Sequence, residues 1–210
     1  MPADNPVALL QDDLDQVLCE RFSASRFLAV DTETRGLNLS RDRLCLVQMC
    51  NEEGVTALVQ VRDQPAPRLK LVLESPGVEK IFHFARFDLA ALRHWLGIRV
   101  NPVFCTKIAS RLVRTYAPRH GLKDLVAELL NIEMDKEAQS SDWASPNLSA
   151  KQLAYAAADV THLVALRERL LEMLIREGRW ELARSCMDFL PTRVDLDLAG
   201  WEAEDIFSHS

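Results

Sequence analysis

The chain has 210 residues, of which 48% are apolar and 27% charged, a composition typical of a soluble globular protein of one ordinary domain. It contains no apolar run near the ~20 residues that a membrane span needs, and residues 1–15 lack the basic-then-apolar pattern of a signal peptide. The net charge of −6 excludes the overall basic surface with which proteins usually grip long nucleic acids, so a nucleic-acid substrate should be short and held through metal ions and a local basic patch.

The first half of the chain predicts a mixed sheet. Residues 6–24 space their apolar side chains as a helix does. Strands are predicted over residues 27–33, 44–50 and 55–61, and their close spacing makes them antiparallel. A helix near 69–73 then leads to a fourth strand over 78–84, which this crossover makes parallel to the first.

The second half of the chain is predicted to be helical. Its helices cover residues 87–96, 106–113, 122–130 and 150–177. With no repeat or linker, residues 1–190 form one α/β domain: three antiparallel strands plus a parallel strand, flanked by helices. The tail at 191–210 carries apolar residues, so we expect it to dock on its own domain or on a neighbouring subunit.

Two carboxylates, Asp31 and Glu33, stand at the end of the first predicted strand. Alternate residues of a strand share a face, so these side chains should lie side by side. Like charges this close disfavour each other's ionisation unless a cation lies between them, and hard divalent cations take oxygen ligands. The pair predicts half of a metal site; the alternative is a solvated strand end.

Two later segments supply further acidic residues. Asp88 lies in the first turn of the helix after the fourth strand, either as a metal ligand or as a partner of the helix dipole. Tyr155 and Asp159 are four residues apart on the long helix and therefore share a face. Four carboxylates meeting at one sheet edge would suit two divalent ions, with Tyr155 orienting a metal-bound water.

These three segments resemble the three motifs of the DEDD 3′-5′ exonuclease superfamily, in its tyrosine-bearing branch. Residues 139–143 and 148–155 resemble ribonuclease D, without the helical nucleic-acid-binding domains that follow its catalytic domain. Over nearly the whole length the chain is similar to the nano-RNase C family of short bacterial relatives, through residues 31–37, 105–110, 119–123 and 196–210.

The resemblance implies an RNase H-like fold, two Mg²⁺ or Mn²⁺ ions and 3′-to-5′ hydrolysis of diribonucleotides to nucleoside 5′-monophosphates at the end of RNA decay. Its metal ligands would be Asp31, Glu33, Asp88 and Asp159, which form the catalytic set together with Tyr155. It also implies a ring-shaped homo-octamer. Five scattered cysteines without a C-x-x-C pair argue for the cytoplasm, and against a zinc or disulfide framework.

Further residues are expected to contact the substrate: Thr32, Leu37, His83, Lys107, Arg111, Ser141 and Trp143. Leu37 would wedge between two bases, and His83 would touch a ribose or phosphate or else be a core histidine. Lys107, Arg111 and Arg114 share a helix face that either meets a 5′-phosphate or is simply solvated. Trp143 either stacks on a base or packs under the metal ligands.

Other functions compete with the diribonuclease. The same chemistry would serve 3′ trimming of longer RNA or of single-stranded DNA, as in ribonuclease D. A non-catalytic RNA-binding subunit is a third interpretation, which the complete set of carboxylates opposes. Hydrolysis of small phosphate monoesters has no separate signal in the sequence.

Overall fold

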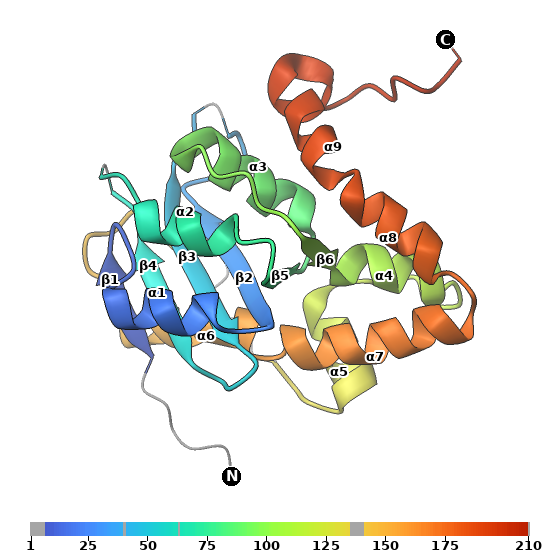
Figure 1. Ribbon diagram of the computed structural model, residues 1–210, viewed down its shortest axis with the longest axis horizontal. Helices are drawn as coiled ribbons and strands as arrows, with labels where there is room; N and C mark the ends of the chain where they lie inside the picture. Colours follow the sequence, from blue (N-terminus) through green and yellow to red (C-terminus); the bar gives the residue numbers. More distant parts are fainter. Residues whose placement is uncertain (1–6, 40, 63, 135–140, 210) are drawn as a thin grey trace.

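The computed structural model describes residues 7–39, 41–62, 64–134 and 141–209 (Figure 1). Its strands are β1 (Ala8–Gln11), β2 (Phe27–Thr34), β3 (Leu44–Asn51), β4 (Thr56–Gln60), β5 (Glu79–Phe82) and β6 (Val103–Cys105). Its helices are α1 (Gln16–Ser23), α2 (Pro67–Leu73), α3 (Ala85–Leu96), α4 (Thr106–Val113), α5 (Leu122–Leu130), α6 (Ala150–Thr161), α7 (Leu163–Arg176), α8 (Trp180–Asp188), α9 (Leu190–Leu196) and η1 (Asp197–Trp201). Residues 139–140 of the ribonuclease D-like motif lie outside the described residues.

The strands form one sheet in the order β1-β4-β3-β2-β5-β6. β2, β3 and β4 are antiparallel neighbours, and β5 runs parallel to β2, which confirms the predicted mixed sheet. β1 pairs with β4 and β6 with β5, both in parallel. These two edge strands were not predicted, because four and three residues are too few to show a strand period.

Two predicted helices are corrected by the structure. The region 6–24 is not a single helix: it begins with β1, and α1 starts only at Gln16, capped by Asp15. The predicted helix over 150–177 is two helices, α6 and α7, that meet at His162. The first half of that region therefore faces the sheet, while the second can turn toward α4 and α5.

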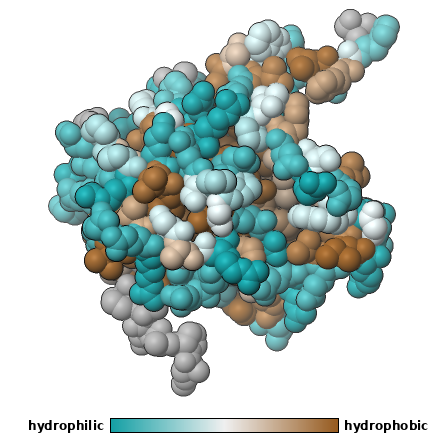
Figure 2. All heavy atoms as spheres, viewed as in Figure 1, coloured by the Kyte–Doolittle hydropathy of each residue, from teal (hydrophilic) through white to brown (hydrophobic). Residues whose placement is uncertain are grey.

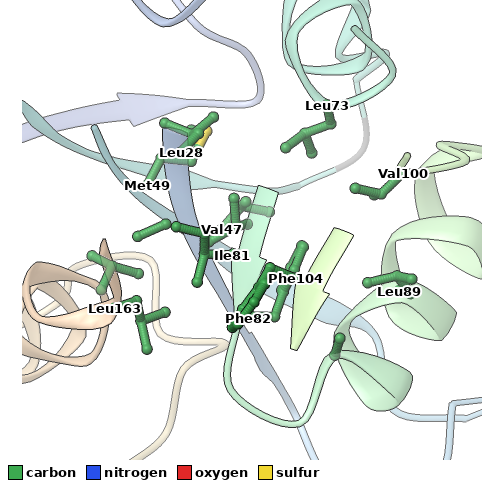
Figure 3. Packing of buried hydrophobic residues seen from close by; sticks show 14 of the residues in the cluster. Leu28, Val47, Met49, Leu73, Ile81, Phe82, Leu89, Val100, Phe104 and Leu163 are labelled. Atoms are coloured by element: carbon green, nitrogen blue, oxygen red, sulfur yellow. The ribbon is translucent and has the colours of Figure 1, made fainter. Parts of the chain in front are cut away.

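Helices cover both faces of the sheet (Figure 1). α3 packs on β2, β3, β5 and β6, whereas α6 contacts β2, β3 and β4 and α7 contacts β2 and β5. Apolar side chains of the central strands fill the space between these layers: Figure 3 shows Leu28, Val47 and Ile81 of the sheet between Leu73 of α2 and Leu163 of α7. This core makes the central strands a rigid base for the residues at their ends.

The C-terminal segment packs partly on its own domain. α9 contacts α3, and Arg86 of α3 forms an ion pair with Asp197, 2.6 Å between Nε and Oδ2. Beyond this contact, Leu198, Trp201, Ile206 and Phe207 are exposed, and Figure 2 shows apolar residues on the projecting segment at the upper right. In the described ranges no helix has the length and apolarity required to cross a bilayer.

Candidate metal and catalytic site

β2 presents its carboxylates where the sheet opens. β5 pairs with β2 only from Phe27 to Ala29, whereas β3 pairs along nearly all of β2. Beyond Ala29 the β5 side of β2 is therefore free for other partners. Asp31 and Glu33 lie in this stretch, two residues apart and partly buried, as the strand period predicts.

Asp88 is held at this opening by the backbone of β2. It lies in the first turn of α3, directly after β5, and is 4% exposed. Both the backbone N–H and the hydroxyl of Thr32 donate to Asp88 Oδ1, at 3.1 and 2.6 Å. The N–H of Thr32, which does not pair with β5, thus holds Asp88 beside Asp31 and Glu33.

α6 brings Tyr155 and Asp159 to the same place. Ser149 and Gln152 form a capping box that starts the helix, and Ala156 is fully buried against the sheet. The small residues at 156–158 let the helix approach the strands closely. The Tyr155 hydroxyl hydrogen-bonds Asp159, the two side chains being one helical turn apart on the same face.

The structure therefore brings together the acidic residues of all three motifs. Carboxylate oxygens of Asp31, Glu33 and Asp159 all lie within 4.8 Å of one another. None of the ion pairs among the described residues involves these three or Asp88. The cluster is a set of close, partly buried acids without a protein cation.

Burial gives these carboxyls unusual pKa values. It raises the pKa of Asp31 well above its usual range, an effect strengthened by Asp88 and Asp159. Burial and the charges of Asp159 and Asp88 raise the pKa of Glu33 to about 8. Burial also raises the pKa of Asp88 to about 7 and that of Asp159 to about 6. A divalent cation would displace these protons and relieve the repulsion, so the oxygen-only cluster fits Mg²⁺ or Mn²⁺.

Tyr155 stays protonated in this setting. Burial, and then the charges of Asp159 and Glu33, raise the pKa of its phenol above the usual range. A phenol of this kind donates a hydrogen bond and does not act as a base near pH 7. A protonated phenol can take the orienting role expected from the sequence, which stays a prediction.

Gln48 was missed by sequence reasoning. It is fully buried on β3 opposite Asp31, and its amide Nε2 donates to Asp31 Oδ2 at 3.3 Å. Its Oε1 has no hydrogen-bond partner among the described residues. The signal was the single amide within the apolar run 44–50, since a fully buried polar side chain requires a specific partner.

A cavity of about 380 Å³ opens over the acids. Besides Asp31, Glu33, Tyr155 and Asp159 it is lined by Thr32, His83, Phe84, Lys107, Met134 and residues 121–124. Three of the expected substrate contacts, Thr32, His83 and Lys107, thus line it. The His83 ring is within 2.9 Å of the Thr106 hydroxyl, and burial and Lys107 lower its pKa to about 4, so it is neutral at pH 7.

Other expected substrate contacts lie elsewhere. Leu37 is 85% exposed in a neighbouring groove, and Arg111 is exposed on α4. Neither Ser141 nor Trp143 is among the described residues that line the cavity. Trp143 is 3% exposed and lies 6.0 Å, ring centre to ring centre, from Tyr155, so it packs behind the tyrosine. Of its two expected roles, the structure favours packing under the metal ligands over stacking on a base.

Arg114 does not share the exposed face of Lys107 and Arg111. Its side chain is buried, ion-paired with Glu128, and donates to the Arg119 carbonyl at 2.9 Å. The reason is that α4 ends at Val113, so the backbone turns before Arg114 and the helical spacing no longer applies. Arg114 thereby ties α4 and α5 to the loop that leads to residues 121–124 of the cavity wall.

Comparison with known proteins gives consistent matches. A family model described as 3′-5′ exonuclease matches residues 6–175. NrnC from Brucella melitensis, solved with bound Mg²⁺ and also bound to pGG, is 46% identical with a TM-score of 0.91, and the match with the Mg²⁺-bound structure covers 97% of this chain and 99% of that one. Ribonuclease D from Gluconacetobacter diazotrophicus is 37% identical over 83% of this chain but only 44% of its own length, so the chain spans less than half of that relative.

Proposed function

The chain belongs to the 3′-5′ exonuclease family, and from this premise we propose that it is a metal-dependent exoribonuclease that hydrolyses very short RNA, with diribonucleotides as its main substrate. The observation that carries the proposal is the meeting of Asp31, Glu33 and Asp159 within 4.8 Å, with Asp88 beside them. Three separate segments of the chain deliver acids to one point, where none of them is ion-paired with a lysine, arginine or histidine of the described residues.

The proposed ligands are Asp31, Glu33, Asp88 and Asp159, holding two divalent ions, Mg²⁺ or Mn²⁺. When bound, such ions lower the pKa of water and stabilise the charge that develops on a phosphodiester during attack. Thr32 fixes Asp88 through two donated hydrogen bonds, and Gln48 restrains Asp31. Tyr155, protonated and bonded to Asp159, is placed to orient the attacking water.

Three observations support a short substrate. The cavity over the acids holds about 380 Å³, and the net charge of the chain is −6, which opposes binding of long polyanions. The similar Brucella melitensis NrnC has been solved bound to pGG. Lys107 lines the cavity and is the cation we assign to a substrate phosphate, whereas Arg111 is exposed on α4 and is not among the described residues that line the cavity.

A length series of RNA oligonucleotides labelled at the 5′ end tests the proposal. We expect turnover with Mg²⁺ or Mn²⁺ to be highest for two nucleotides and to fall steeply with length, and Asp31→Asn to remove all of it. Undiminished processing of long strands would instead support trimming of longer RNA or of single-stranded DNA. That alternative is favoured by the 37% identity to ribonuclease D. No hydrolysis at any length would leave an RNA-binding subunit.

The oligomeric state belongs to the same proposal. The exposed apolar residues Leu198, Trp201, Ile206 and Phe207 support an assembly of several copies through the C-terminal segment. Mass in solution measured by light scattering, before and after deletion of residues 200–210, tests it. A monomer before deletion would contradict the assembly without affecting the proposed chemistry.

A further inference from the structure

Phe84 has a backbone conformation that a phenylalanine rarely adopts. It precedes α3 with φ 69° and ψ 46°, in the left-handed region that glycine enters without strain. Burial of the ring does not compensate this backbone strain, because Phe84 is 45% exposed. A bulky residue held in a strained conformation and open to solvent is more often found at a ligand site than in a fold-stabilising role.

The ring also lies between two hollows of the surface. One is the cavity over the acids; the other is a groove of about 710 Å³ between the loop after β2, α3 and η1. Phe84 is the one residue that lines both among the described residues. A ligand whose phosphate lies at the acids, and whose other end extends into the groove, therefore passes the ring of Phe84.

The groove is suited to a flat uncharged group. Its apolar lining includes Leu37, Leu39, Phe87 and Leu198. Its two arginines are already paired: Arg86 with Asp197, at 2.6 Å, and Arg41 with Asp42, at 2.7 Å. A phosphate would find no unpaired arginine there in the described part of the chain, whereas a base would find apolar surface.

We propose that Phe84 is a base-stacking residue and that the groove beside it is a nucleobase subsite of the exonuclease. A base of the substrate lies on the ring, with the 85% exposed Leu37 on the same groove wall. Lys107 supports the ring from one side, its Nζ lying 4.4 Å from the ring centre. The inference rests on the proposed function, because it assumes a substrate that carries bases.

Replacement of Phe84 by Leu tests the stacking, because it keeps an apolar side chain and removes the π-face. We expect kcat/KM for a 5′-phosphorylated dinucleotide to fall roughly 5- to 150-fold, mainly through KM, and Phe84→Trp to restore most of it. The matched control is Phe189→Leu, the same change at a 38% exposed ring that lines neither hollow. It should leave kcat/KM unchanged.

Dinucleotides that lack one base separate stacking from a general structural role. If a base lies on Phe84, removing that base should make wild type and Phe84→Leu equally active, while removing the other base should preserve their difference. Phe84→Gly, which suits the left-handed backbone, should keep the melting temperature and still lose activity on the complete dinucleotide. An equal loss on every substrate, or no loss at all, overturns the inference.

Binding measured without turnover distinguishes this failure from failure of the proposed function. A dinucleotide containing 2-aminopurine, titrated in Ca²⁺, should be quenched by wild type and bound more weakly and with less quenching by Phe84→Leu. Quenched binding without any hydrolysis in Mg²⁺ or Mn²⁺ would reject the exonuclease proposal and keep the base subsite. Normal hydrolysis with identical binding by both proteins would reject only the base subsite, and absence of binding would reject both.

Discussion

Two buried charged regions of this protein are built in opposite ways. Lys80 on β5 is fully buried, and its ammonium donates to three carbonyls, those of Ser75 and Val78 at 2.6 Å and of Asn101 at 2.8 Å. Burial lowers its pKa to about 8, so it remains charged at pH 7. The acids at the end of β2 are also withdrawn from water, yet in the described part of the chain they face one another without an ion-pair partner.

The difference separates a structural charge from a functional one. At Lys80 all three donors are used by the protein, so the charge fixes the turns around β5 and needs nothing more. At the acids, burial and mutual repulsion disfavour the ionised carboxylates. A bound cation would offset both effects, because an opposite charge favours the ionised form. A buried charge left without a protein partner is thus the stronger indication of a ligand site.

The largest effect is expected from Asp31→Asn. Loss of the carboxylate at the centre of the cluster should lower the turnover rate by roughly 10²–10³-fold or more, because the charge of the transition state loses its stabilisation. Its melting temperature in EDTA should not fall, since one member of a repelling set is removed. Turnover assays and thermal melts of the same sample check both parts; a variant that retains activity would contradict the assignment.

The converse effect is expected from Lys80→Met. Three buried carbonyls would lose their donor, at a cost of about 1–3 kcal/mol for each group left unsatisfied, so the free energy of unfolding should fall markedly. Activity per folded molecule should change little, because Lys80 does not line the cavity. Urea unfolding and turnover measured side by side check this prediction. Lys70→Met, at an exposed lysine, is its control.

Tyr155→Phe should have an intermediate effect. It removes the hydroxyl that bonds Asp159 and keeps the ring that packs on Trp143. We expect turnover to drop roughly 10- to 100-fold, as for other groups that orient a metal site, with no change in fold. A loss as large as that of Asp31→Asn would mean that the phenol does more than orient water.

The last prediction concerns stability and not turnover: it is a pH dependence of stability in the absence of metal. The folded pKa values of Glu33, Asp88 and Asp159, about 8, 7 and 6, lie above the usual carboxyl range near 4, so the folded state binds more protons within that interval. Stability in EDTA should therefore fall as pH rises from about 4 to 8. Thermal melts across this range should show the decline, and Mg²⁺ should reverse it; a flat profile would contradict the shifted pKa values.

Local periodicity was enough to predict the main elements and the acids. Asp31 and Glu33 follow the strand period, and Tyr155 and Asp159 the helical period, so a face could be assigned to each pair. Whether the faces meet depends on the sheet order, which the crossover and antiparallel rules constrained correctly.

What the sequence did not predict depends on tertiary burial. Arg114 and Trp143 carry groups typical of substrate contacts, but packing places both inside. Gln48 and Phe84 were missed for the opposite reason. The amide within the apolar run 44–50 indicates that a partner exists but not which residue it is, and an aromatic residue before a helix has no distinctive local pattern. The significance of Gln48 follows from its partner Asp31 on the neighbouring strand β2, and that of Phe84 from its positive φ angle.

The most direct test is an anomalous difference map from crystals of the protein soaked in Mn²⁺. The central claim predicts metal peaks within coordinating reach of Asp31, Glu33 and Asp159, and their disappearance in Asp31→Asn. Saturating Mn²⁺ that leaves this cluster without a peak, in a protein that still hydrolyses dinucleotides, would contradict the account.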